Sequence, residues 1–295
     1  MAARPFRFGL NLIPNGSREQ LQEVCRIAED TGYDVITVSD YITLDLPPAG
    51  IKAWSTRPPL LTLAAAAQAT RRVQLGSYAL NASLYRPALV AREVNALQDI
   101  SDGRLEVGIG AGYLKADFEA ADVPWGNASE RVGRAERLVD GLRAMAADPV
   151  PPVLLGTSTS ELMLDLAARK ADIVSLTGAE SKTEFSRARL LSSERIATQC
   201  KAARATAAGR EADVELNVLV HAVHLADSAR ADPPEFPNVE QPSTDELRRL
   251  PGILTGTPRS IAEDLHRYRE EYGISYYTIR VPHMADFAAV ISAVR

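Results

Sequence analysis

The sequence predicts an α/β protein built as a (β/α)8 barrel, in which a closed ring of eight parallel strands lies inside a layer of helices. Eight short apolar runs alternate along the chain with eight segments of helical pattern. The runs are continuously apolar, which is typical of strands covered on both faces. A doubly wound open sheet is the competing architecture, but the motif Gly-x-Gly-x-x-Gly that usually follows its first strand is replaced here by LNLIPNGSRE.

Local signals define the elements. Prolines and glycines separate the apolar runs, and helices begin at capping residues such as Ser17 or at proline pairs such as Pro58-Pro59. Strands are expected at residues 6–12, 33–39, 73–78, 104–110, 153–156, 172–176, 213–225 and 275–281. Helices are expected at residues 17–31, 58–70, 87–101, 130–147, 159–170, 184–208 and 258–272, with a last helix that ends at Val294.

Segment lengths differ between the two ends of this predicted barrel. Long inserts follow strands two, four and seven, at residues 40–57, 110–129 and 226–255. The turns at the opposite end are tight, as at 102–103. Catalytic residues of such barrels lie at the carboxyl ends of the strands, so the elaborated end is the expected site. We expect residues 1–295 to form one domain, with 226–255 as a lid over the site.

Composition narrows the function classes. The 295 residues are 46% hydrophobic and 24% charged, as expected for an ordinary soluble globular protein, and the net charge of -5 disfavours nucleic acid or an anionic membrane as partner. No apolar run reaches the length of a spanning helix. The two cysteines, Cys25 and Cys200, form no disulfide framework or metal motif, which fits the cytoplasm.

The most informative stretch is 73–113, VQLGSYALNASLYRPALVAREVNALQDISDGRLEVGIGAGY. It predicts a strand, an irregular polar loop, a helix that begins at Arg86-Pro87, a tight turn at Asp102-Gly103 and a second buried strand. Both strands end in small, flexible residues. A planar ligand can approach the backbone closely at such positions, because glycine has no side chain.

This block resembles the luciferase-like flavin and deazaflavin oxidoreductases. Further pieces of the same resemblance are AEDTGYDVITVSD (28–40), VLLGTSTSELMLDLAARKADIV (153–174) and GTPRSIAEDLHRYREEYGISYYTI (256–279). The AADVPW segment is most similar to the actinobacterial branch that uses coenzyme F420, an 8-hydroxy-5-deazaflavin. The resemblance implies a bacterial-luciferase-like barrel and an oxidoreductase that binds F420, with FMN as the alternative cofactor.

The resemblance places Asp40 near the reactive edge of the cofactor ring. Many deazaflavin relatives have a histidine next, where this chain has Tyr41. A tyrosine can donate a proton but is a weaker acid than histidine at neutral pH. Asp40 and Tyr41 are therefore the catalytic candidates, with capping of the following loop as the structural alternative for Asp40.

The resemblance also implies a non-prolyl cis peptide bond between Tyr78 and Ala79 that bulges toward the ring. Asn81 would then offer its amide to the carbonyl edge of the ring, or close an ordinary Asx turn instead. The run Gly110, Ala111 and Gly112 would let the ring approach the backbone, with a tight turn as the alternative.

Residues Gly156, Thr157 and Ser158 stand between a predicted strand and a predicted helix. Backbone N–H groups and the helix dipole make such a turn suitable for the phosphate of the cofactor tail. The rival interpretation is a capping box from Ser158 to Glu161, which would satisfy the same N–H groups internally.

Other polar residues give weaker signals. His221 and His224 stand three apart on a predicted strand and so face opposite sides, and no metal site is expected. His283 and Arg280 lie at the rim, where the histidine would be structural or touch substrate and the arginine would meet an anionic substrate. Trp54 and Trp125 would line the pocket or pack their loops.

We therefore predict hydride transfer between F420 and a small organic substrate at the mouth of the barrel. The alternatives are an FMN-dependent two-component monooxygenase and a cofactor-binding protein without turnover. Relatives that oxidise sugar phosphates carry glutamate where this chain has Tyr113, which disfavours that activity. Dimerisation through the second and third helices is common in relatives, and the alanine-rich run 64–69 permits close helix packing.

Overall fold

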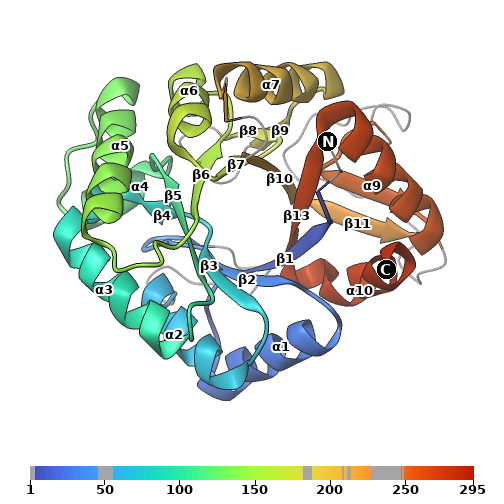
Figure 1. Ribbon diagram of the computed structural model, residues 1–295, viewed down its shortest axis with the longest axis horizontal. Helices are drawn as coiled ribbons and strands as arrows, with labels where there is room; N and C mark the ends of the chain where they lie inside the picture. The colour runs from blue at the N-terminus through green and yellow to red at the C-terminus, as the bar shows by residue number, and fades with distance from the viewer. Residues whose placement is uncertain are drawn as a thin grey trace.

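The chain forms a closed parallel barrel surrounded by helices (Figure 1). The computed structural model describes residues 4–45, 56–181, 188–207, 209–210, 214–226, 247 and 249–295. In the described residues the strands follow the order β3-β2-β1-β13-β10-β7-β6-β5-β4, and pairing of β3 with β5 closes the ring. Each pairing in this ring is parallel, which confirms the predicted (β/α)8 barrel over the open sheet.

The barrel strands coincide with the apolar runs of the sequence, because each strand is buried by helices outside and side chains inside. Their outward residues, such as Phe8 and Leu10, are fully buried under the helices. The ring and its short extension consist of β1 (Arg7–Leu12), β2 (Val35–Val38), β3 (Gln74–Ser77), β4 (Leu80–Asn81), β5 (Leu105–Gly110), β6 (Val153–Thr157), β7 (Ile173–Leu176), β10 (Glu215–Val220) and β13 (Ile274–Arg280).

The helices begin at residues whose side chains satisfy their first N–H groups. Ser17 and Asn127 each form a capping box with the residue three positions later, Gln20 and Glu130. The main helices are α1 (Arg18–Asp30), α2 (Pro59–Ala69), α3 (Pro87–Ile100), α4 (Lys115–Ala120), α5 (Ala128–Met145), α6 (Glu161–Lys170), α7 (Ser193–Thr206), α9 (Pro258–Tyr272) and α10 (Met284–Val294).

The inserts contain structure that the sequence did not predict. The expected strand 213–225 breaks at His221, so that β10 stays in the barrel and β11 (Ala222–Leu225) pairs with β12 (Ile253–Gly256) outside it. The prediction of helix at residues 188–192 was wrong, because β8 (Ala179–Ser181) and β9 (Ala188–Leu190) form an antiparallel pair and Ser192 caps α7. Residues 184–187 of that predicted helix lie outside the described residues. Most of the predicted lid, 227–246 and 248, lies outside the described residues.

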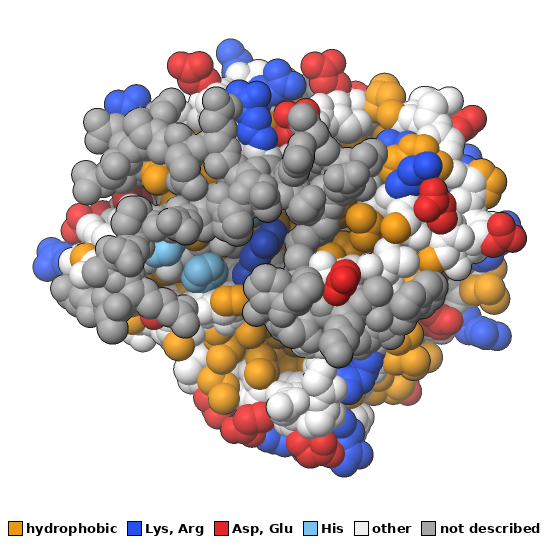
Figure 2. Space-filling model, turned by 180° about the vertical axis from the view of Figure 1, so that it is seen from behind, with side chains coloured by type: hydrophobic (Ala, Val, Ile, Leu, Met, Phe, Trp, Pro, Cys, Tyr) orange, Lys and Arg blue, Asp and Glu red, His pale blue; other side chains and the backbone are white. Residues whose placement is uncertain are grey.

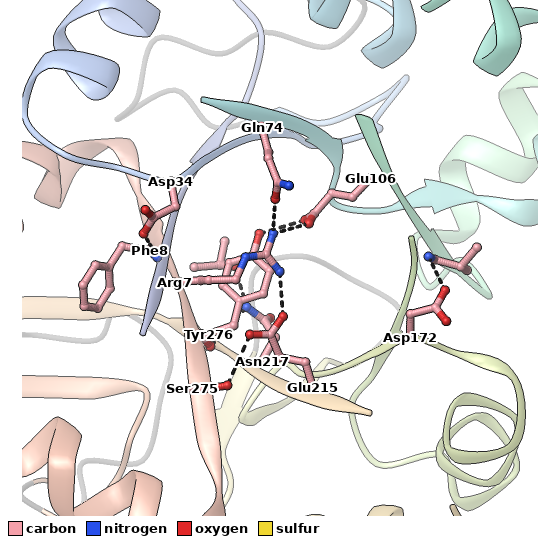
Figure 3. Close-up of polar contacts among 12 residues, drawn as sticks. Arg7, Phe8, Asp34, Gln74, Glu106, Asp172, Glu215, Asn217, Ser275 and Tyr276 are labelled. Carbon is pink, nitrogen blue, oxygen red and sulfur yellow. Dashed lines mark hydrogen bonds and ion pairs between the residues drawn. The ribbon is translucent and has the colours of Figure 1, made fainter. Parts of the chain in front are cut away.

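An ion-pair cluster fills the amino-terminal end of the barrel (Figure 3). The Arg7 guanidinium lies 2.7 Å from the Glu106 carboxylate and 2.6 Å from that of Glu215. The Tyr276 hydroxyl donates to the other Glu106 oxygen at 2.8 Å, and the guanidinium lies 4.4 Å from the centre of the Tyr276 ring. Both carboxylates are buried, so Arg7 compensates their charge in the interior.

We expect replacement of Arg7 by alanine to lower the free energy of unfolding by about 3–5 kcal/mol, because two carboxylates are then buried without a counter-charge. Urea unfolding at neutral pH measures this loss. The triple variant Arg7→Ala, Glu106→Gln, Glu215→Gln should recover a large part of it, since it removes the charges as well. Equal losses in the single and triple variants would contradict an electrostatic role.

The structure also bears on the cysteines and on membrane-spanning helices. Cys25 and Cys200 are both buried free thiols, so they form no disulfide with each other. Within the described residues, no helix combines the length and apolarity needed to cross a membrane.

Candidate functional site

The carboxyl ends of β2, β4 and β5 bring three of the candidate residues together. The Asp40 carboxylate, just after β2, accepts a hydrogen bond from the backbone N–H of Asn81, with 3.0 Å between Oδ2 and N. Asn81 ends β4, and the strand register places it opposite Gly110 at the end of β5. The three residues therefore share one end of the barrel, although the helix α3 separates the last two in sequence.

The surroundings of Asp40 change the pKa of its carboxyl group. Burial raises its pKa to about 6, although the Asn81 N–H and the Tyr85 hydroxyl hydrogen-bond to the carboxylate and oppose the rise. The nearby Asp117 carboxylate adds to the rise. A carboxyl group that titrates so close to neutrality is suited to proton transfer. Tyr85 gave no signal in the sequence, because its contact with Asp40 depends on how the loop after Asn81 folds.

The peptide bond between Tyr78 and Ala79 is cis, as the resemblance implied. The Tyr78 hydroxyl lies 2.7 Å from Ser175 Oγ on β7 and donates to Asn217 Oδ1 on β10 at 3.2 Å. The side chain thus crosses the interior from β3 to the opposite wall. It forms part of the floor beneath the mouth of the barrel.

The side chain of Asn81 closes the turn that follows it. Its Oδ1 accepts a hydrogen bond from the Ser83 N–H at 3.2 Å, which is the Asx turn considered above. Gly112, whose φ is +78°, lies directly against this amide, and a Cβ there would come within 2.3 Å of Oδ1. Gly112 is therefore required by both its backbone conformation and its neighbour. A contact of the Asn81 amide with a cofactor stays a prediction.

The adjacent strands β5 and β6 present bare backbone toward the mouth. A Cβ at Gly110 would meet Ala79 Cβ at 3.7 Å, an ordinary contact, and a Cβ at Gly156 would meet no described heavy atom within 4 Å. Ala111 follows Gly110 and is half-buried. The backbone at Gly156 thus faces space without described atoms, and Gly110 on the adjacent strand carries no side chain, an arrangement that fits the face of a planar tricyclic ring.

The turn at 156–158 differs in detail from the prediction. Thr157 is the last residue of β6 and is buried, and the Gln199 side-chain amide donates to the Ser158 carbonyl. The helix begins two residues later than expected, so Ser160 is the cap and accepts from the Met163 N–H at 3.2 Å. The capping box from Ser158 to Glu161 was therefore wrong. A phosphate contact at 156–158 stays a prediction.

A pair of tyrosines lies at the mouth, and the sequence did not predict that they meet. The hydroxyls of Tyr41 and Tyr113 are 3.1 Å apart, and their rings are perpendicular at 6.3 Å between centroids. Burial raises the pKa of both phenols, so both are neutral at neutral pH. The sequence offered one sign of this pair, because each tyrosine directly follows a predicted site residue, Asp40 or Gly112.

Asp117 holds the loop that carries Tyr41. Its Oδ1 accepts hydrogen bonds from the N–H of Ile42 at 3.2 Å, the N–H of Thr43 at 2.8 Å and the Thr43 hydroxyl at 2.6 Å. The carboxylate is 2% exposed and belongs to α4, a helix within the insert after strand four that the sequence did not predict. It therefore ties two of the three inserts together beside the site.

We expect Asp117→Ala to reduce the free energy of unfolding by about 2–3 kcal/mol, because it leaves the N–H groups of residues 42 and 43 without their acceptor. Urea unfolding measures the loss. Glu119→Ala is the matched control on the same helix, because Glu119 is exposed and its carboxylate lies 3.1 Å from the Lys115 ammonium. A similar effect in both variants would show that Asp117 does not anchor the loop.

The rim histidines have structural contacts. The His221 ring lies 2.6 Å from the Thr177 carbonyl, and burial lowers its pKa to about 3. His224 and His283 lie 6.3 Å apart between ring centroids, and burial lowers the pKa of His283 as well. The rings of His221 and His283 are therefore neutral at neutral pH. Within the described chain, no three His, Cys, Asp or Glu side chains group as metal ligands.

The structure describes one of the two tryptophans, Trp125. Trp125 packs edge-on against Phe118 at 4.6 Å, and the Arg131 guanidinium lies 4.0 Å from the centre of its ring. These contacts hold the loop that carries Trp125 against α4, which belongs to the same insert. They support the packing role of Trp125 over a pocket-lining one. Trp54 lies outside the described residues.

A separate pocket of about 290 Å³ lies at the amino-terminal end of the barrel, lined by Arg4, Pro5, Arg7, Pro152, Asp172, Ile173 and Glu215. It contains none of the candidate residues. Barrel enzymes place their chemistry at the other end, where the carboxyl termini of the strands meet. Arg7 and Glu215 in this pocket belong to the stabilising cluster, and Asp172 pairs with Arg143 at 3.2 Å.

Comparisons with known proteins agree with this fold. A family profile described as luciferase-like monooxygenase matches residues 4–275. The 5,10-methylenetetrahydromethanopterin reductase of Archaeoglobus fulgidus is 28% identical over 133 residues, 45% of this chain and 36% of that protein. The F420-dependent glucose-6-phosphate dehydrogenase of Intrasporangium calvum is 32% identical over 133 residues, 44% of this chain and 38% of that protein.

Both sequence matches thus span little more than a third of the curated relative. Among solved structures, an F420-dependent secondary alcohol dehydrogenase in complex with an F420-acetone adduct aligns with a TM-score of 0.72 at 16% identity. This alignment covers 99% of this chain and 100% of the other. At that identity the likeness concerns the fold, and it supports the closed barrel described above.

Proposed function

Because the chain belongs to the luciferase-like monooxygenase family, we propose that it is an oxidoreductase that uses coenzyme F420. The reaction is hydride transfer between the deazaflavin and a small organic substrate at the carboxyl-terminal mouth of the barrel. Curated relatives that are named F420-dependent dehydrogenases, among them that of Intrasporangium calvum, support this choice of cofactor.

One observation carries the proposal. The backbone at Gly156 meets no described heavy atom within 4 Å, and the side-chain-free Gly110 stands on the adjacent strand, at the same barrel end as the titratable carboxyl group of Asp40. A planar ring against this wall places its edge within reach of an acid–base group. The site thus combines the shape that the cofactor needs with the group that proton movement needs.

When bound, the deazaflavin supplies the hydride donor and acceptor at the central carbon of its ring. The chain positions the substrate against that carbon and excludes water. Asp40 takes up or releases the accompanying proton, and Tyr41 is the second candidate for this role. Residues 78–81, 110–112 and 156–158 would hold the cofactor, the first two groups at the ring and the third at the phosphate of the tail.

The alternative cofactor is FMN, used by a monooxygenase that receives reduced flavin from a separate reductase. The description of the family as monooxygenases supports this alternative. Titration of the purified protein with F420 and, separately, with FMN distinguishes the two by quenching of ligand fluorescence. We expect a Kd for F420 at least tenfold below that for FMN. The reverse order favours the monooxygenase, and binding of neither cofactor overturns the proposal.

Turnover separates an enzyme from a protein that only stores the cofactor. Reduced F420 mixed with the protein and a panel of enones, ketones and imines should be oxidised faster than without protein for at least one class. Sugar phosphates are not expected among the substrates of this chain, because Tyr113 replaces the glutamate of the relatives that oxidise them. Tight binding of F420 without turnover of any substrate class would favour a protein that only stores the cofactor.

We also propose a homodimer formed through α2 and α3. Leu61 on α2 is 71% exposed and Leu89 on α3 is 51% exposed, an unusual exposure for large apolar side chains. Sedimentation velocity should give a dimer for the unmodified protein and a monomer for Leu61→Glu. Leu162→Glu on α6 is the matched control, because that leucine is 52% exposed on another helix. A monomeric unmodified protein would rule the dimer out.

A further inference from the structure

Arg280 is an arginine at the mouth that no carboxylate neutralises in the described part of the chain. It ends β13, opposite Asn11 of β1, and its side chain is half-buried. Within the described residues its guanidinium forms neither an ion pair nor a hydrogen bond. Arg7, at the other end of the same barrel, is paired with two carboxylates. In the described part of the barrel, the arginine at the base is thus paired with carboxylates and the one at the mouth is not.

Three tyrosine hydroxyls lie within electrostatic range of Arg280. Burial raises the pKa of Tyr41, Tyr78 and Tyr113, and the positive charge of Arg280 opposes the rise in all three. The guanidinium is therefore close to the floor of the mouth and to the tyrosine pair. Figure 2 shows histidine and Lys or Arg side chains near the centre of one face of the molecule.

Within the described residues, the carboxylates at the mouth use their hydrogen bonds on partners other than Arg280. The Asp117 carboxylate is occupied by three hydrogen bonds from residues 42 and 43. Asp40 is hydrogen-bonded to Asn81 and Tyr85. The ring of His221 is neutral at neutral pH and adds no positive charge of its own. In the described part of the chain the Arg280 guanidinium is thus left without direct contact to a carboxylate.

We propose that Arg280 binds a carboxylate group of the substrate, so that the substrate of this enzyme is a small organic acid. This inference rests on the proposed function, because it specifies which compounds enter the same site. A guanidinium binds a carboxylate through two parallel N–H donors, and such a bond is strong where water is excluded. The phenols of Tyr41 and Tyr113 supply polar lining beside it.

Paired probes test the inference without knowledge of the substrate. Isothermal titration calorimetry compares benzoate with benzamide, which share size and shape and differ in charge. We expect benzoate to bind at least tenfold more tightly than benzamide to the unmodified protein, with and without F420. The ratio should fall to within twofold in Arg280→Gln and remain intermediate in Arg280→Lys. Arg26→Gln is the matched control, because Arg26 is an exposed arginine on α1.

The outcomes separate this inference from the proposed function. Equal affinities for benzoate and benzamide overturn the anion site, as does a preference that persists in Arg280→Gln. If Arg280→Gln weakens F420 binding and leaves the benzoate preference unchanged, the arginine serves the cofactor and the inference is wrong. If F420 does not bind but the benzoate preference depends on Arg280, the anion site stands and the proposed function fails. Should Arg280→Gln not fold, Arg280→Lys and Arg280→Met provide the comparison.

Discussion

Asp40→Asn is expected to make the protein more stable at pH 8 and less active. The pKa of Asp40 is about 6 in the folded protein, against an ordinary value of 3.8. The folded state therefore binds the proton more tightly than the unfolded state does. Stability from this group is fully present below about pH 4, is lost as the pH rises from about 4 to about 6, and then stays constant. Asparagine is neutral throughout and removes this loss.

The expected gain at pH 8 is up to about 3 kcal/mol in the free energy of unfolding, because one pKa unit corresponds to about 1.4 kcal/mol. At pH 4 the variant and the parent should be nearly equal. Urea unfolding at both pH values measures the difference. Asp99→Asn, at an exposed position on α3, is the control and should change stability at neither pH. A loss of stability at pH 8 would contradict the burial of an ionised carboxylate.

The catalytic activity of Asp40→Asn should fall, although the stability of this variant rises at pH 8. General acid–base groups contribute about 10²–10⁴-fold to rate, so we expect turnover of reduced F420 to fall by at least about 100-fold in Asp40→Asn. The unmodified enzyme should show an inflection of rate near pH 6, and the variant should lack it. A rate that falls above this pH identifies Asp40 as the acid, and one that falls below it identifies the base. An unchanged profile in the variant would assign the proton to another group, such as Tyr41.

The barrel could be predicted because its sequence signal is local and repeated. Each strand is a short, continuous apolar run, and the pattern does not depend on which residues meet in space. The same rule placed Asp40, Asn81 and Gly110 at one end, since all three follow or end a parallel strand. The cis bond at Tyr78 carries no local sequence signal and was available only through the resemblance.

The missed features depend on contacts across the fold. β4 has two residues and β8 has three, too short for a periodic pattern. The break at His221 is set by its bond to the Thr177 carbonyl, on a different strand end. The roles of Tyr113 and Asp117 arise where the insert after strand four packs on the insert after strand two. The misplaced cap at Ser158 followed from a strand that continues one residue further, to Thr157.

Gly156 offers the most direct test of where the cofactor lies. A side chain at this position would meet no described heavy atom within 4 Å, and no left-handed φ applies to it. The folded protein should therefore accept larger residues there, and Gly156→Ala and Gly156→Leu are expected to melt within a few degrees of the parent. A ring that lies against this wall cannot share the space with a leucine side chain. We expect the Kd for F420 to rise by at least about 100-fold in Gly156→Leu, and by less than tenfold in Gly156→Ala.

Comparison of the alanine and leucine variants at Gly156 separates exclusion of the ring from a general disturbance of the barrel. Gly133→Leu is the matched control, because Gly133 lies on α5 and a Cβ there meets only the Arg137 side chain, at 3.6 Å. It should leave F420 binding unchanged, since α5 packs outside the ring of strands. If Gly156→Leu binds F420 as tightly as the parent while remaining folded, the planar ring does not occupy the wall formed by β5 and β6. The cofactor would then have to be placed elsewhere on the rim, and Asp40 would lose its position beside the reactive edge.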